Sequence, residues 1–200
     1  GDYLPQGKGS EVIERMMRKS YEILSEHRVN KKRVEKGLNP ANSIWIWGEG
    51  KKPALDDFTE KYNLKGSVIS AVDLIKGIAI CAGLETIEVE GATGNIHTNF
   101  YGKAKAALKA LNEGQDFVYI HVEAPDECGH RNEIKNKPRA IELIDKEIVK
   151  TIKEELDSQG EDYKIMVLPD HATPLSLRTH TRDAVPFVIY DSRESTGKRD

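Results

Sequence analysis

The sequence contains little cysteine, no excess of basic residues and no long hydrophobic run. Its two cysteines, Cys81 and Cys128, are too few for a disulfide framework and favour a reducing compartment. With 30 basic and 33 acidic residues, the chain has a formal net charge of -3, which argues against nucleic acid as a partner. No run approaches the roughly 18 apolar residues of a membrane span, and no signal-peptide pattern opens the chain. These absences predict a soluble cytoplasmic protein with no membrane partner.

The 200 residues suffice for one ordinary domain, or for one domain with an appendage. Apolar runs typical of strands alternate with segments of helical periodicity. This alternation predicts an α/β fold, with a mainly parallel sheet and helices on both faces. The expected strands span residues 43–47, 67–71, 86–89, 117–122, 164–168 and 185–190. The expected helices span residues 11–27, 58–62, 73–82, 102–111 and 139–156, and the basic segment 30–40 is expected to be a loop.

Two of the expected helices carry specific signals. Ser10 is expected to cap the first helix, and Gly83 is expected to end the helix that begins at residue 73. The long helix has an apolar stripe that is expected to face the core. The stripe consists of Ile141, Ile144, Ile148, Ile152 and Leu156.

Five possible metal ligands follow two of the expected strands. Asp126 and His130 come after the strand at 117–122, and a helical turn there would place both side chains on one face. Asp170 and His171 come after the strand at 164–168, and His180 lies in the loop beyond. The carboxyl ends of parallel strands are where ligands gather in such sheets, so these side chains are expected to converge.

Carboxylate and imidazole groups together suit Mn²⁺, Zn²⁺, Fe²⁺ or Co²⁺ better than Mg²⁺ or Ca²⁺. Five ligands exceed the needs of one closed structural zinc site, so an open or a paired metal centre is expected. Each pattern alone is weak, because an isolated Asp-x-x-x-His is more often coincidence. A closed site with four ligands would instead favour a non-catalytic metal-binding domain.

Three other features carry weaker signals. His121 lies in an apolar strand, where a hydrogen-bonded core histidine is the commoner outcome and a role supporting the metal ligands is the alternative. Residues 121–123 match the His-x-Glu of zinc deaminases, but the Pro-Cys-x-x-Cys of that family does not follow. The turn at 48–53 could offer backbone N–H groups and the ammonium groups of Lys51 and Lys52 to a phosphate, although it is not a Walker loop.

Taken together, these stretches resemble the cofactor-independent phosphoglycerate mutases of the archaeal type, which belong to the alkaline phosphatase superfamily. The resemblance is carried by HVEAPDECGH at 121–130, LPDHATP at 168–174, and HT with VPF between 180 and 187. Residues 45–53 and 69–77 also resemble the family, and the match extends over essentially the whole chain. It implies an alkaline-phosphatase-like core.

The family interconverts 3- and 2-phosphoglycerate in glycolysis through a phosphoserine intermediate, with two divalent ions that are usually Mn²⁺. The resemblance implies that Asp126, His130 and His180 hold one ion and that Asp170 and His171 hold the other. Zn²⁺, Co²⁺ and Mg²⁺ are alternative metals. The lysines that the resemblance offers for binding a small phosphorylated substrate are Lys51, Lys52 and Lys76.

The family's nucleophilic serine and a further metal-binding aspartate belong to an N-terminal segment that residues 1–120 do not match. The chain is therefore expected to be an internal fragment, inactive alone, that binds the second ion weakly. Residues 1–42 would be the tail of an inserted substrate-binding domain, and residues 43–200 an incomplete core with apolar edges that favour association. The alternatives are a related phosphatase or phosphotransferase, such as a member labelled homoserine kinase, and a non-catalytic metal-binding domain.

Overall fold

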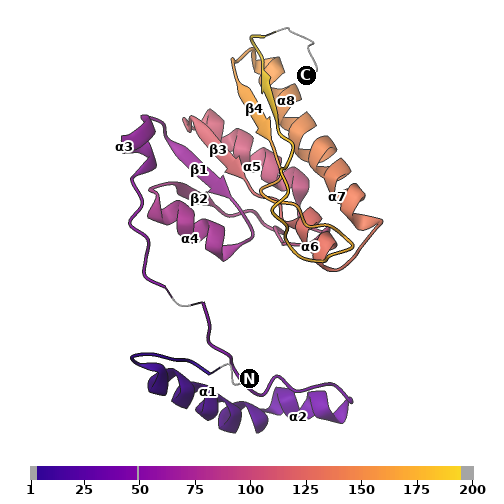
Figure 1. The fold of residues 1–200 in the computed structure, drawn as a ribbon. Helices are drawn as coiled ribbons and strands as arrows, with labels where there is room; N and C mark the ends of the chain where they lie inside the picture. The colour runs from indigo at the N-terminus through magenta and orange to yellow at the C-terminus, as the bar shows by residue number, and fades with distance from the viewer. Residues whose placement is uncertain (1–3, 49, 195–200) are drawn as a thin grey trace. The chain divides into compact units, whose positions relative to one another are not determined.

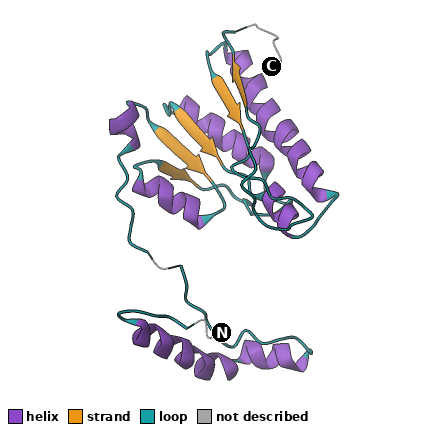
Figure 2. Ribbon diagram, viewed as in Figure 1, coloured by secondary structure: helices purple, strands orange, loops and turns teal. Residues whose placement is uncertain are grey.

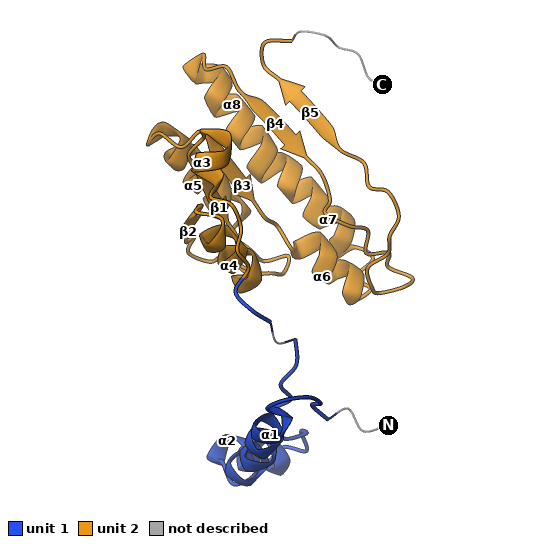
Figure 3. Cartoon of the chain, turned by 60° about the vertical axis from the view of Figure 1, so that its left-hand side comes forward, with its two compact units in different colours: residues 1–52 blue, residues 53–200 orange. Residues whose placement is uncertain are grey.

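The computed structural model describes residues 4–48 and 50–194, which belong to two compact units (Figure 3). Unit 1 is Gly1–Lys52 and unit 2 is Pro53–Asp200. The sequence placed a domain boundary between residues 42 and 43, whereas the chain divides after Lys52. The interpretation of the first segment as part of a substrate-binding domain stays a prediction.

Unit 1 contains two helices, α1 (Ser10–Ser25) and α2 (Arg28–Glu35). The prediction of a loop from residue 30 was wrong, because the His27 side chain accepts a hydrogen bond from the Val29 amide and caps a second helix. Ser10 is the first residue of α1 rather than its cap, which is Gly9 in a left-handed conformation.

The expected strand at 43–47 is absent from the described part of unit 1. Its tryptophans alternate as in a strand, but no strand in the described part of the chain pairs with this segment, and Trp45 and Trp47 are 62% and 75% exposed. Alternation alone therefore did not produce a strand here, because a strand needs a partner for its backbone groups.

The packing of unit 1 depends on the buried side chain of Asn30. Its amide nitrogen donates to the carbonyls of Leu24 (2.6 Å) and Ala41 (3.0 Å), and its oxygen accepts from the Ala41 amide (2.9 Å). Asn30 is only 5% exposed, so these three bonds lie away from water and join both helices to the segment that follows them.

We expect Asn30→Ala to destabilise unit 1 by about 1–2 kcal/mol, because it leaves buried backbone groups without partners. Amide hydrogen exchange should accelerate in α1 and α2 and stay unchanged in unit 2. Asn39→Ala removes an exposed asparagine of the same unit and serves as the control. Equal exchange rates in the two variants would contradict the prediction.

Unit 2 contains a three-stranded parallel sheet of order β2-β1-β3 (Figure 2). The strands are β1 (Gly66–Ile69), β2 (Glu85–Ile87) and β3 (Phe117–Ile120), and the short helix α3 (Phe58–Tyr62) precedes them. Helix α4 (Asp73–Cys81) connects β1 to β2, and α5 (Phe100–Asn112) connects β2 to β3. The second connection runs back across β1, so right-handed crossovers place the two helices on opposite faces. The predicted α/β fold with a parallel sheet is confirmed.

The last two strands pair with each other instead of extending that sheet. Strands β4 (Lys164–Val167) and β5 (Val188–Asp191) form an antiparallel pair. Their apolar residues Met166, Val188 and Ile189 are exposed. The strand positions were predicted approximately, but their antiparallel pairing was not, because a hydrophobic run does not specify which neighbour it joins.

The expected long helix is present as an unbroken helical run, seen beside β4 in Figure 1. It consists of α7 (Asn136–Leu143), a π-helical segment (Ile144–Val149) and α8 (Lys150–Gln159). The predicted stripe was wrong at Ile141, which is 55% exposed, whereas Ala140 is buried. In a pure α-helix, side chains four residues apart point in directions that differ by about 40° around the helix axis. The wider turns of the π-helical segment offset this rotation and keep the later isoleucines facing the core.

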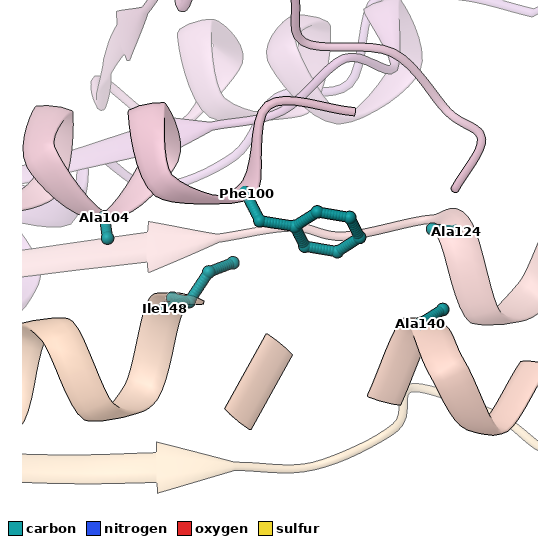
Figure 4. Packing of buried hydrophobic residues seen from close by; sticks show 5 residues of the cluster. All are labelled: Phe100, Ala104, Ala124, Ala140 and Ile148. Carbon is teal, nitrogen blue, oxygen red and sulfur yellow. The ribbon is translucent and has the colours of Figure 1, made fainter. Parts of the chain in front are cut away.

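The core of unit 2 lies between this helical run, α5 and the start of α6 (Ala124–His130) (Figure 4). Its buried members are Phe100, Ala104, Ala124, Ala140 and Ile148. The small alanines allow the helices to approach closely, which fixes α6 at the end of β3. Within the described residues, no helix combines the length and apolar character needed to cross a membrane.

Candidate metal centre

Helix α6 presents the first two of the predicted ligands. Pro125 is at its start, where proline fits the first turn of a helix, and the helical turn considered from the sequence is present. Asp126 and His130 then lie one turn apart on the same face, with 3.2 Å between Asp126 Oδ2 and His130 Nε2.

The loop after β4 supplies the remaining three ligands and lies against α6 (Figure 1). An isolated antiparallel bridge joins Ala172 to Thr181, and the Thr181 amide donates to the Ala172 carbonyl at 3.0 Å. This bridge holds His171 and His180 together, with ring centroids 3.7 Å apart. The structure therefore brings all five predicted side chains into one cluster.

Asp126, His130 and His180 form one group of ligand atoms. His180 Nε2 lies 3.3 Å from Asp126 Oδ1 and 3.1 Å from His130 Nε2. Ligands around one tetrahedral or octahedral ion, with bonds of about 2.0–2.1 Å, are separated by roughly 3.0–3.4 Å. The closest approaches between these three side chains fall in this range, although they involve both oxygens of Asp126.

The tautomer of His130 also suits metal binding. Its Nδ1 lies 2.9 Å from the Arg178 carbonyl, which can only accept, so Nδ1 carries the proton. The lone pair is then on Nε2, which faces Asp126 and His180. Arg178 adopts a left-handed conformation (φ 55°), an unusual backbone state that turns this carbonyl toward the histidine.

Asp170 and His171 form a second group beside the first. His171 Nε2 lies 3.3 Å from Asp170 Oδ2, and His171 Nδ1 lies 3.3 Å from the Thr173 hydroxyl. That hydroxyl donates to Asp126, so it is free to accept the Nδ1 proton and leave the Nε2 lone pair toward Asp170. Thr173 thus orients Asp126 in the first group and His171 in the second.

The two groups are close enough to share members. Asp126, His171 and His180 each offer a ligand atom, and these atoms lie within 4.8 Å of one another. Asp126 is therefore the common neighbour of both groups. Asp170 and His180 are exposed, so the cluster is open to solvent on their side.

Close packing keeps the loop against α6. The Lys137 ammonium donates to the carbonyls of Pro125 (2.9 Å) and Thr173 (3.0 Å). Gly129 lies so near the loop that a Cβ at this position would be 2.5 Å from the Thr173 carbonyl oxygen. Neither contact was predictable from the local sequence, because each depends on how two distant segments pack.

We expect Thr173→Val to lower the affinity for Zn²⁺ or Mn²⁺ by about 10- to 100-fold, the usual effect of losing a group that orients metal ligands. Valine preserves the shape but not the hydroxyl. Thr173→Ser, which keeps the hydroxyl, should bind metal nearly as well as the original chain. Isothermal titration of the three proteins provides the test, and equal affinities in the Val and Ser variants would contradict it.

Of the three predicted substrate-binding lysines, only Lys76 belongs to unit 2. The Lys76 ammonium on α4 donates to both carboxylate oxygens of Glu88, at 2.7 and 2.9 Å. Lys51 and Lys52 are exposed residues at the end of unit 1. Their role toward a substrate stays a prediction.

Several titratable groups lie around the end of β3, close to the cluster. Burial lowers the pKa of His121, while the carboxylate of Asp170 acts in the opposite direction. Burial also lowers the pKa of Lys103, whose ammonium donates to the His121 carbonyl at 2.8 Å. The pKa of Glu123 is raised by burial and by the neighbouring carboxylates of Glu127 and Asp126.

Comparison with known protein families identifies one match over nearly the whole chain. Residues 7–199 match the family described as the Metalloenzyme superfamily. The donor set fits this description, because carboxylates and oriented imidazoles are ligands for divalent metals.

The relatives with similar sequences carry one shared name. The chain is 52% identical, over 94% of its length, to the 2,3-bisphosphoglycerate-independent phosphoglycerate mutase of Methanosarcina acetivorans. It is 50% identical, over 97% of its length, to a probable mutase of that name from Geobacter sulfurreducens. The chain spans 47% and 48% of these proteins, or about half the length of the curated relatives it matches.

A solved structure also shares the fold. A protein from Pyrococcus horikoshii superposes with a TM-score of 0.77 and 34% identity, over 92% of this chain and 48% of that protein. The resemblance predicted from the sequence motifs is thus confirmed at the level of family and fold.

Proposed function

Since this chain belongs to the Metalloenzyme superfamily, we propose that it forms the metal-binding part of a cofactor-independent phosphoglycerate mutase. The whole enzyme would interconvert 3- and 2-phosphoglycerate. The observation that carries the proposal is the pair of ligand groups around Asp126, each with a histidine whose proton is fixed on Nδ1 by a neighbour.

We assign Asp126, His130 and His180 to one ion, and Asp170 and His171 to the other. Divalent ions held there would neutralise phosphoryl oxygens and activate a hydroxyl nucleophile. Thr173 fixes the Asp126 carboxylate, and the Arg178 carbonyl fixes the His130 ring, so the ligands are oriented before an ion arrives. Mn²⁺ is the metal we propose first, with Zn²⁺, Co²⁺ and Mg²⁺ as alternatives.

We further propose that the phosphorylated serine belongs to the part of the protein that corresponds to the other half of the relatives' length. Ser67 and Ser70 of unit 2 do not suit that role, because both are buried at the middle strand of the sheet. The cytoplasmic location expected from the sequence also stays a prediction.

The test is an assay of the full-length natural protein with 3-phosphoglycerate and Mn²⁺, beside the 200-residue chain alone. We expect mutase activity from the full-length protein, its loss on chelation, and none from the chain. Activity only toward homoserine with ATP, or only phosphate release, would replace the proposed reaction with a related one. Mutase activity in the chain alone would contradict the placement of the nucleophile.

A further inference from the structure

His121 lies where the carboxyl ends of β1 and β3 meet, the position at which the sheet reverses its winding direction. It directly follows β3, and its amide donates to the Ile69 carbonyl at 2.8 Å. Ligands bind at such switch points in parallel α/β sheets. Its side chain is half-buried rather than enclosed in the core.

The neighbouring Ser70 determines which ring nitrogen of His121 carries the proton. The Ser70 hydroxyl oxygen accepts from the Val72 amide at 3.0 Å and lies 3.3 Å from His121 Nδ1. Ser70 is only 3% exposed, and no other acceptor for its proton is present among the described residues. An unused hydroxyl proton there would cost about 1–3 kcal/mol, so Ser70 donates to Nδ1.

This arrangement gives His121 the opposite tautomer from that of His130. With Nδ1 accepting, the proton of the neutral ring is on Nε2, whereas His130 presents a lone pair on Nε2. A protonated Nε2 cannot ligate a metal, but it can donate a hydrogen bond.

Two carboxylates of the metal centre lie near the His121 ring. Asp170 and Asp126 both favour its charged form electrostatically, whereas Lys103 opposes it. Lys103 is buried and its ammonium is bound to the His121 backbone carbonyl. Among residues 4–48 and 50–194, no protein group hydrogen-bonds His121 Nε2.

We propose that His121 donates its Nε2 proton in a hydrogen bond to an anionic oxygen of the substrate held at the metal centre. Ser70 is then a positioning residue that keeps the proton on Nε2. The ligand class is a phosphorylated hydroxy acid, whose phosphoryl and carboxylate oxygens both accept such a bond. This inference rests on the proposed function and adds a substrate contact to it.

The first experiment measures the tautomer directly, by ¹⁵N NMR of the histidine rings in the 200-residue chain. We expect the proton of His121 on Nε2 before and after addition of Zn²⁺, and a shift toward Nδ1 in Ser70→Ala. A proton on Nδ1 in the original chain, or loss of the Nε2 proton when Zn²⁺ binds, would overturn the proposal. The tautomer measurement requires no enzymatic activity, and its main result comes from the chain without any substitution.

The second experiment adds 3-phosphoglycerate, or inorganic phosphate as a simpler anion, to the Zn²⁺-loaded chain. The His121 Nε2 signals should shift on titration, and the affinity should fall about 10- to 100-fold in His121→Asn, as expected for a lost bond to a charged group. Zn²⁺ affinity should not change. His97→Asn, at an exposed histidine of the same unit, is the matched control.

Equal anion affinities in the two variants, or a parallel loss of Zn²⁺ affinity in His121→Asn, would refute a substrate contact. In the full-length protein, His121→Asn should raise KM for 3-phosphoglycerate by a similar factor. If the full-length protein lacks mutase activity but the anion still shifts His121, the proposed reaction fails while this contact stands.

Discussion

Replacement of Asp126 by asparagine is expected to lower the affinity of the chain for Zn²⁺ or Mn²⁺ by about 100-fold or more, beyond the usual effect of losing a supporting group. Asp126 is the shared neighbour of the cluster, 3.2 Å from His130, 3.3 Å from His180 and 3.9 Å from His171. Asparagine is nearly the same size but has no charge and only one oxygen. The loss should therefore fall on metal binding rather than on folding.

Isothermal titration of the metal-free chain with each ion measures this effect. Asp145→Asn replaces an exposed carboxylate in the π-helical segment and controls for the change in net charge. The two variants should unfold at similar temperatures without metal. If Asp126→Asn still bound metal as tightly as Asp145→Asn, the ligands would have to be other residues.

Gly129→Ala should disrupt the centre without altering any ligand. The added methyl group would lie 2.5 Å from the Thr173 carbonyl oxygen and 2.8 Å from Thr173 Cγ2. Either α6 or the loop must shift, at a cost of about 1–3 kcal/mol in folding free energy. Because the loop bears three of the five ligands, we also expect metal affinity to fall by at least about 10-fold.

Gly77→Ala is the matched control, because Gly77 is also helical but has no atom within 4 Å of an added Cβ. This substitution should stabilise the chain by about 0.5–1 kcal/mol through the better helix propensity of alanine. Chemical denaturation and metal titration of both variants give the comparison. A Gly129→Ala variant as stable and as metal-competent as Gly77→Ala would show that the close contact is unimportant.

Much of unit 2 was predictable because its signals are local. The Pro125 turn places Asp126 and His130 on one helix face, and both features are contained in seven residues of sequence. Unit 1 was predicted less well. The segment at 43–47 has the alternation of a strand, but strand formation depends on a partner that the local pattern does not reveal.

The sequence alone determined the candidate ligands, because residue type sets the metal chemistry. It also determined that β1, β2 and β3 are parallel, because a helical segment connects each strand to the next. The antiparallel pairing of β4 with β5 and the close approach at Gly129 required the folded chain, because they depend on contacts between distant segments. The same holds for the opposite tautomers that we infer for His130 and His121. A histidine has two possible neutral forms in any sequence, and the neighbours that folding provides, here the Arg178 carbonyl and the Ser70 hydroxyl, select between them.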